Sequence, residues 1–439
     1  MRKHKIKEVT TGATLALLVL ASNRAHSQGP ESLSLDQAVK IARANAFVVT
    51  AAQADVRRAQ GAVSEAKSSS MPKLTLDGTY TRFDREQTAD VGGGPPIVIR
   101  PIDQKRVSLS LVQPIDLFGV FGLGISGAWA LKYAADSQVQ AAMNDAALTA
   151  KSAFYQVIKA EDLLDVAEES LANAQRRLEV AQKKVSAGAV AKFEVIRAES
   201  DVAAAEQEKI RSKNSVALTK ASLNNALARD PNTEFEIVRP EGLPKLQSNL
   251  QTMTESAKSS RPELRALQMQ LSFRTKFRQA REKGNLPSLT ISARHDRDPD
   301  AGGFGSQSDS TTAVAALSIP LYEGGLTRAR VKQAKEDEEV AKIRLDQATL
   351  GVELEVKQAF LNLETASKLI EVAESNVAKA KEALRLANLR YENDIGTQLE
   401  VSDAELQYAR AMSSLAAARF DYRDAWARMQ RAVGKEDIA

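Results

Sequence analysis

The sequence contains no cysteine among its 439 residues, so no disulfide can hold any part of it together. An exported protein without disulfides must be stabilised by packing or by association with other copies. The N-terminal segment also lacks the cysteine that is acylated in bacterial lipoproteins, and we therefore expect no lipid anchor.

Groups that commonly perform chemistry are scarce as well. Beyond the first 27 residues the only histidine is His295, which has no second ligand at metal-binding spacing, and we expect it to be a surface residue. There is no nucleophile motif, and the glycine-rich run 119–127 lacks the Lys-Ser/Thr pair of a phosphate-binding loop. These absences predict a protein that is not an enzyme and that needs no cofactor or metal.

An excess of positive charge is missing from most of the chain. The net charge is +4 and the pI about 9.0, but residues 1–27 hold five Lys or Arg and one Glu, which is also +4. The remaining chain is neutral, so the sequence does not favour nucleic acid as a partner.

Long apolar runs are absent too, since a membrane-spanning helix needs about 20 apolar residues and no later stretch provides them. The N-terminus has the form of a secretory signal, with four basic residues before an apolar core at 13–21 and a small-residue cleavage site at 25–27. We predict a signal peptide at 1–27 and export of the rest.

The second half of the chain repeats the first at an offset of 206 positions. Ala359-Phe360 matches Ala153-Phe154, Glu400-Val401 matches Glu194-Val195, and Pro320 matches Pro114. Each copy reads as helix, strand, strand and long helical hairpin. We expect one repeat at 28–229, a linker at 230–252, a second repeat at 253–434 and a tail at 435–439.

Each repeat contains two segments in which apolar and polar residues alternate. Leu74, Leu76 and Tyr80 share one face of the first segment, and Thr and Asp residues occupy the other. Strands are predicted at about 73–84, 106–114, 287–296 and 311–321, with loops of Gly, Asp and Ser between the members of each pair. Their length suits a tilted transmembrane strand, which needs about 9–11 residues. A soluble sandwich would alternate similarly, but export and the small polar face favour a membrane wall.

Long helices occupy most of the remaining sequence. Large and small residues alternate at spacings of three and four, as in Leu164, Ala167, Leu171 and Ala174, which is typical of a coiled-coil seam. Helices are predicted at about 34–68, 121–187, 191–229, 254–284, 325–393 and 398–433. Ser34 and Gln37 form a capping box at the first of them. The longest helices should extend about 100 Å.

Four strands cannot close a barrel, and an open sheet in lipid would leave unpaired backbone groups that cost several kcal/mol each. Other copies of the chain must therefore supply the missing strands. Three copies would supply 12, an even number within the range of outer-membrane barrels. The predicted fold class is mainly α with a transmembrane β-barrel: a homotrimer in which a 12-stranded barrel continues into a 12-helix α-barrel.

The duplicated order and three sets of residues make the chain resemble the TolC-like outer-membrane efflux family over about residues 33–434. These sets are the strand-ending Pro-Ile-Asp-Leu-Phe-Gly at 114–119, its counterpart Pro-Leu-Tyr-Glu-Gly-Gly at 320–325, and the hairpin tips at 184–195 and 390–401. The resemblance implies a passive exit duct in the outer membrane of a Gram-negative-type bacterium, extending into the periplasm. A periplasmic adaptor and an inner-membrane transporter would deliver substrate to it for efflux or type I secretion.

The resemblance also implies particular residues. Glu400 and Asp403, at i and i+3 on one helix face, would narrow the entrance, although an ordinary solvated face is the alternative. Arg197 could pair with Asp403 across the hairpins, and Asp394 stands where the family commonly has glycine. The residues expected at the tips and in adaptor docking are Gly188, Lys192, Glu194, Arg197, Tyr391, Gly396 and Thr397.

Aromatic residues near the predicted strand ends suggest a girdle at the lipid boundary. They are Tyr80, Phe83, Phe118, Phe121 and Tyr322, for which packing in a core or loop is the alternative. The rival to the duct as a whole is a periplasmic coiled-coil scaffold or adaptor, which usually carries one hairpin rather than two. The sequence does not indicate the transported substrate.

Overall fold

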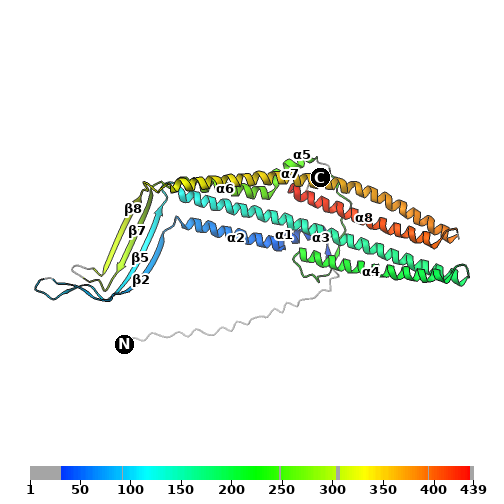
Figure 1. Cartoon of the computed structure of the whole chain (residues 1–439), viewed down its shortest axis with the longest axis horizontal. Coiled ribbons are helices and arrows are strands. Elements are labelled where there is room, and N and C mark those ends of the chain that lie inside the picture. Colours follow the sequence, from blue (N-terminus) through cyan, green and yellow to red (C-terminus); the bar gives the residue numbers. More distant parts are fainter. Residues whose placement is uncertain (1–30, 91, 247–248, 303–306, 394, 436–439) are drawn as a thin grey trace, which may run out of the picture.

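A computed structural model describes residues 31–90, 92–246, 249–302, 307–393 and 395–435, and the predicted signal peptide lies outside them. The molecule is elongated, with a sheet at one end and two helical hairpin tips at the other (Figure 1). Within the described residues, no helix is apolar over a length that could cross a membrane.

The two repeats are built alike, as the offset of 206 predicts. Helices α3 (Val120–Ser186) and α7 (Leu326–Glu392) are both 67 residues long and begin 206 positions apart. Each turns back into a shorter helix, α4 (Lys192–Ala226) or α8 (Gln398–Val433). The structure therefore confirms the two long hairpins.

The four long strands form one antiparallel sheet in the order β2-β5-β7-β8. They are β2 (Lys73–Arg82), β5 (Asp103–Ile115), β7 (Ser288–Arg297) and β8 (Asp309–Ser318). Register aligns the apolar residues of all four on one face, and that face is exposed along Leu74, Leu76, Leu109, Leu111, Ile291 and Leu317. In the described chain β2 and β8 are edge strands with one neighbour each.

Two predicted helices are each divided in two. The helix predicted at 34–68 is α1 (Leu35–Asn45) and α2 (Phe47–Ser68), because Ala46 has extended backbone with ψ 137°. The break lets Ala42 and Val49 enter the same core. The capping box of Ser34 and Gln37 is present at α1.

The helix predicted at 254–284 is α5 (Leu250–Ser260) and α6 (Pro262–Glu282). Proline disfavours the helical conformation in the residue before it, and Arg261 accordingly has ψ 118°. Pro262 then stands at the first position of α6, where its missing N–H costs nothing.

Four short strands were missed by the sequence patterns. A parallel pair joins β1 (Glu31–Leu33) to β6 (Phe235–Ile237), and thus brings the predicted linker against the start of the first repeat. A second pair, β3 (Gln87–Ala89) and β4 (Ile97–Arg100), forms a hairpin inside the first inter-strand loop. Strands of three or four residues are too short to show a period of two.

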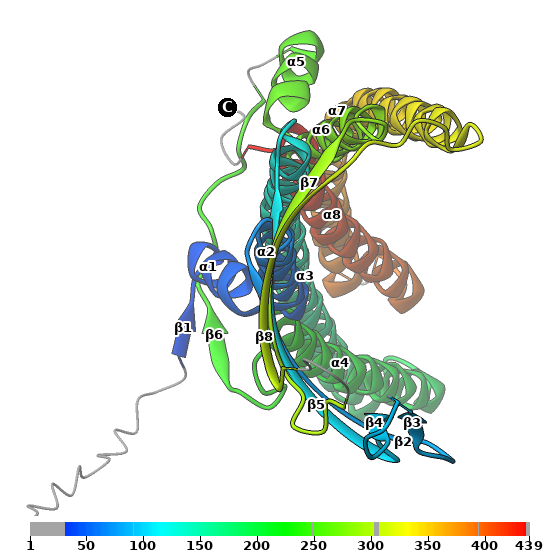
Figure 2. The same ribbon diagram turned by 90° about the vertical axis from the view of Figure 1, so that its left-hand side faces the viewer.

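Each repeat has its own apolar core at mid-length. The first centres on α3, with Val49, Phe154 and Leu223 among its fully buried residues. The second joins α5, α6, α7 and α8 around Val356 and Met429, and it includes Trp426. The helices and sheet form a curved wall, with α1, β1 and β6 on its convex side (Figure 2).

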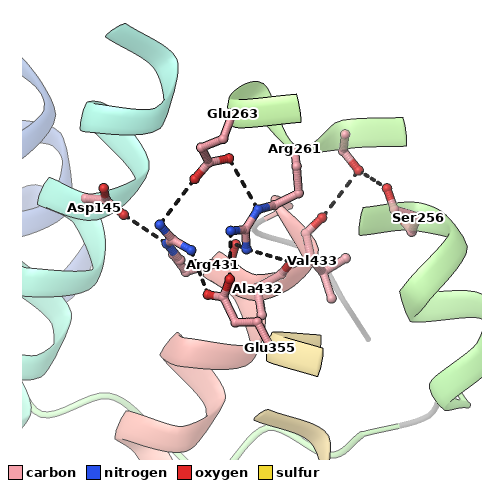
Figure 3. Close-up of polar contacts among 9 residues, drawn as sticks. Asp145, Ser256, Arg261, Glu263, Glu355, Arg431, Ala432 and Val433 are labelled. Carbon is pink, nitrogen blue, oxygen red and sulfur yellow. Dashed lines mark hydrogen bonds and ion pairs between the residues drawn. The ribbon is translucent and has the colours of Figure 1, made fainter. Parts of the chain in front are cut away.

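A group of five charged residues connects the two repeats where α8 ends, and we call it the arginine cluster: Asp145, Arg261, Glu263, Glu355 and Arg431 (Figure 3). Arg431 contacts Glu355 at 2.6 Å, Asp145 of α3 at 2.8 Å and Glu263 at 3.2 Å. Arg261 contacts Glu355 at 2.7 Å and Glu263 at 3.2 Å, and it donates to the carbonyl of Ala432 at 3.0 Å. The cluster fixes the end of α8 against three other helices.

Candidate functional site: the hairpin tips

The first tip is a tight turn that depends on glycine. Gly188 has φ +72°, a left-handed conformation that residues with a Cβ adopt at a cost of about 1–2 kcal/mol. Its N–H donates to the carbonyl of Val185 at 2.9 Å as α3 ends. Lys192 is the first residue of α4, and Glu194 lies in its first turn, where the helix dipole favours a carboxylate.

The second tip is closed by backbone bonds to one carbonyl. The N–H groups of Ile395 and Gly396 both donate to the carbonyl of Arg390 at 2.9 Å. A Cβ on Gly396 would come within 2.9 Å of the Cβ of Arg390, so the turn requires glycine here. Thr397 caps α8 by accepting from the N–H of Glu400 at 3.2 Å. Asp394 lies outside the described residues.

Glu400 and Asp403 lie on an exposed face of α8, beside the second tip. Val401, between them, is buried against the rest of the hairpin. The carboxylate of Glu400 lies 3.3 Å from Nε of Arg390, which is an exposed ion pair. Both carboxylates are therefore accessible at this end of the chain, and their role in narrowing the entrance stays a prediction.

The two hairpins contact each other at Tyr391, which the sequence analysis names, and at Arg177, which it does not. Nζ of Lys184 donates to the carbonyl of Tyr391 at 3.0 Å and lies 4.0 Å from the centre of its ring. Eleven positions before Gly188, Arg177 of α3 forms an ion pair with Glu405 of α8 and lies 3.6 Å from Asp201 of α4. Among the described residues Arg197 makes no ion pair with Asp403, so the hypothesised contact is replaced by that of Arg177.

Arg177 is largely buried beside a cavity of about 230 Å³ that α3, α4 and α8 line together. Burial lowers the pKa of Arg177, and the charge of Asp201 opposes that shift. The offset of 206 pairs Arg177 with Ala383, so the two repeats differ here. That difference is a sequence signal that marks Arg177, although it does not identify the partners Asp201 and Glu405.

The five predicted girdle residues lie at the two ends of the sheet. Tyr80 donates to Asp103 at 2.7 Å on the exposed apolar face, and Arg100 lies 4.3 Å from the ring centre of Phe83. At the opposite end Phe118, Phe121 and Tyr322 lie where the strands lead into α3 and α7. Whether they meet lipid stays a prediction.

The described residues contain no group of three or more His, Cys, Asp or Glu side chains arranged to hold a metal ion. Nδ1 of His295 lies 2.9 Å from the hydroxyl of Thr311 on the neighbouring strand, at the exposed surface.

Two repeats that together form a four-stranded sheet with two free edges and two long helical hairpins are the architecture of outer-membrane exit ducts. The sequence profile of the family described as outer membrane efflux protein matches residues 38–229 and 253–435. The chain belongs to this family. It is an outer-membrane duct of the efflux and secretion type, and the match across both repeats rules against the periplasmic adaptor.

Individual relatives agree with this assignment. The chain is 24% identical to outer membrane protein TolC of Escherichia coli (strain K12), over 93% of this chain and 83% of that protein. It is 20% identical to alkaline protease secretion protein AprF of Pseudomonas aeruginosa, over 77% of this chain and 72% of that protein. Its fold is similar to the crystal structure of the Campylobacter jejuni CmeC outer membrane channel, with a TM-score of 0.77, 16% identity, and coverage of 92% and 87%.

Proposed function

We propose that three copies of the chain assemble into a continuous duct, with a 12-stranded barrel in the outer membrane and 12 helical strands in the periplasmic wall. The observation that carries this proposal is the sheet, which has an exposed apolar face and two edge strands. In lipid, unpaired edges cost several kcal/mol for each backbone group, so β2 of one copy must pair with β8 of the next. Three copies of four strands give an even number within the known range.

Because the chain lacks cysteine, introduced cysteines can test the assembly directly. One variant carries Thr79→Cys on β2 and Ser310→Cys on β8, both on the polar face. A flexible bismaleimide should link it into covalent trimers in native membranes. The control variant carries Val112→Cys and Ser292→Cys, which face each other on β5 and β7 of one chain. It should give only cross-linked monomers. Monomers alone from the first variant would refute the closed trimer.

In this assembly the hairpin tips form the periplasmic entrance, where an adaptor would dock and connect the duct to an inner-membrane transporter. The duct itself would conduct passively and carry out no catalysis. In such an assembly the pump rather than the duct would select the substrate.

Glu400 and Asp403 would form a ring of six carboxylates that narrows the entrance and favours cations. A planar-bilayer recording of the Glu400→Gln/Asp403→Asn variant should show reduced cation selectivity. The Glu336→Gln/Glu339→Gln variant is a matched control. It also removes two carboxylates that are three residues apart, but near the sheet end of α7 and far from the tips. If both variants keep the selectivity of the parent, the constriction lies elsewhere.

A further inference from the structure

The first turns of α7 carry a concentration of positive charge that the equivalent turns of α3 lack. Residues 327–335 contain Arg328, Arg330, Lys332 and Lys335 and no acid. The offset of 206 maps this segment onto 121–129, which contains no charged residue at all. Because the two helices have the same length and register, the basic segment is a property of the second repeat alone.

The positive charge is placed against the local electrostatics of the helix. The N-terminus of a helix carries a partial positive charge, which disfavours cations by about 0.3–1 kcal/mol each. The first turn of α7 contains no acidic residue to compensate. Among the described residues, the side chains of Arg328 and Lys332 form no ion pair or hydrogen bond. Glu323, just before α7, accepts from the hydroxyl of Thr327 at 2.6 Å and does not pair with either cation.

Helix geometry places three of these cations on one side of α7. Thr327 and Ala334 are buried, and Glu338 bonds to Thr275 and Arg278, so this stripe of α7 faces α6. Arg328 and Lys335 each follow a residue of that stripe, about 100° further round the helix, and Lys332 lies on the same side.

That side is the convex one. Seen from the sheet end, α2, α3, α6 and α7 follow one another clockwise along the curved wall (Figure 2). A right-handed helix running away from the viewer also turns clockwise. Residues that lie a quarter turn beyond the stripe facing α6, such as Arg328 and Lys335, therefore point away from the concave side of the wall. Arg330, about 200° from Arg328, points to the concave side instead.

The segment that precedes the cations is apolar and almost fully exposed. Leu321 and Tyr322, between β8 and α7, are 94% and 89% exposed. Arg328 and Lys332 follow the first residue of α7 by about 3 Å and 9 Å along the axis. The polar layer of a bilayer is about 5–8 Å thick on each side. Both cations are thus within side-chain reach of lipid headgroups when the sheet spans the hydrocarbon.

The first repeat has a different set of interfacial residues at the same height. Trp129 stands at the position equivalent to Lys335 and stacks on Tyr133 with ring centres 5.8 Å apart. Nζ of Lys67 lies 5.5 Å from the centre of the Trp129 ring. Trp, Tyr and basic residues gather at membrane interfaces because their side chains combine apolar and polar parts.

We propose that Arg328 and Lys332, assisted by Lys335, bind the phosphate groups of anionic phospholipids in the periplasmic leaflet of the outer membrane. This inference rests on the barrel placement proposed above and adds a lipid partner to it. Basic side chains at a membrane surface attract anionic lipid by about fivefold each at physiological salt. The contact would fix the height of the duct in the membrane at α7 of each copy.

Quenching of a tryptophan by brominated lipid tests this proposal in the full-length protein. The reporter is Tyr322→Trp in a Trp129→Phe background, while Trp426 stays buried far from the sheet as a constant signal. The reporter protein is reconstituted with brominated phosphatidylglycerol or brominated phosphatidylcholine in otherwise identical vesicles. We expect phosphatidylglycerol to quench at a several-fold lower mole fraction, and high salt to reduce that preference.

Two further variants separate a specific lipid contact from net charge. Arg328→Gln/Lys332→Gln should quench equally with both lipids, whereas Arg330→Gln, which removes a cation from the opposite side, should keep the preference. Heat-modifiable migration of each variant checks its assembly. Equal quenching by both lipids in the reporter protein overturns the lipid contact and leaves the duct intact. The proposal is also overturned if Arg330→Gln loses the preference for phosphatidylglycerol as fully as Arg328→Gln/Lys332→Gln does. Absence of quenching by either lipid refutes the membrane placement itself.

Discussion

Replacing Arg261 by methionine should destabilise the fold more than any surface charge change, because this arginine is the centre of the arginine cluster. Its side chain is only 5% exposed, although it carries a full charge. It contacts Glu263 and Glu355 and donates to the last carbonyls of α8. Methionine fills a similar volume and offers none of these donors, so each carboxylate loses one of the two cations that it contacts.

The size of the effect follows from burial. Removing one partner of a buried ion pair costs about 3–5 kcal/mol, since the other charge stays behind without compensation. Glu263 and Glu355 are 33% and 39% exposed, so water can recover part of that loss. Arg431 also continues to contact both. We therefore expect the low end, about 3 kcal/mol in the free energy of unfolding. Urea titration of the detergent-solubilised protein, followed by Trp426 fluorescence in the adjoining core, measures it.

The same variant should change the response to acid. Burial by itself would raise the pKa of Glu355, but the hydrogen bond and charge of Arg261, with the charge of Arg431, lower it below the ordinary 4.5. A carboxylate with a depressed pKa contributes stability above its unfolded value and loses that contribution as pH falls through the folded value. The parent should lose stability below about pH 4.5, and Arg261→Met should lose less over the same range.

Arg274→Met is the control, because Arg274 and Asp337 form an ion pair with 42% and 54% exposure. Exposed pairs contribute about 0–1 kcal/mol, so this variant should unfold almost like the parent. If Arg261→Met and Arg274→Met lose similar free energy, or if acid destabilises the parent and Arg261→Met equally, the arginine cluster does not hold the end of α8 as described.

Two other predictions concern the hairpins. Arg177→Met should raise the conductance of the resting channel in planar bilayers, because it removes the buried contact of α3 with Glu405. The control Arg176→Met changes an exposed neighbour and should leave the conductance unchanged. Equal conductance in the two variants would refute a role of Arg177 in keeping the resting channel closed. In urea titrations Gly188→Ala should cost about 1–2 kcal/mol, because the residue has positive φ. Gly351→Ala should stabilise the protein by about 0.5–1 kcal/mol, because Gly351 lies in the interior of α7 and a Cβ there would meet no atom within 4 Å. A stabilised Gly188→Ala or a destabilised Gly351→Ala would show that backbone conformation does not decide stability at these two positions.

The sequence predicted the long elements because their patterns persist over many residues. Large and small side chains that alternate at spacings of three and four over 67 residues predict a long helix, and the same pattern recurs at an offset of 206. The strands were predictable from alternation alone, including the apolar face of Leu74 and Leu76. The breaks at Ala46 and Arg261 were missed, although Pro262 marks the second of them.

The tips were predictable in position but not in their contacts. Gly188 and Gly396 stand where each turn needs glycine, and Thr397 stands where a helix cap is favoured. The partners of Arg177 were not predictable, because Asp201 and Glu405 come from two other helices and no local spacing relates them.

By itself the sequence determined the repeat, the long hairpins and the two faces of the strands, because these depend on residue order within one segment. Only the tertiary structure decided that Arg261 and Arg431 share carboxylates from α6 and α7, and that Arg328, Lys332 and Lys335 lie on the convex side of the wall. Both depend on how separate helices are placed beside one another. That placement is fixed by the packing of whole surfaces, to which residues far apart in the chain contribute together.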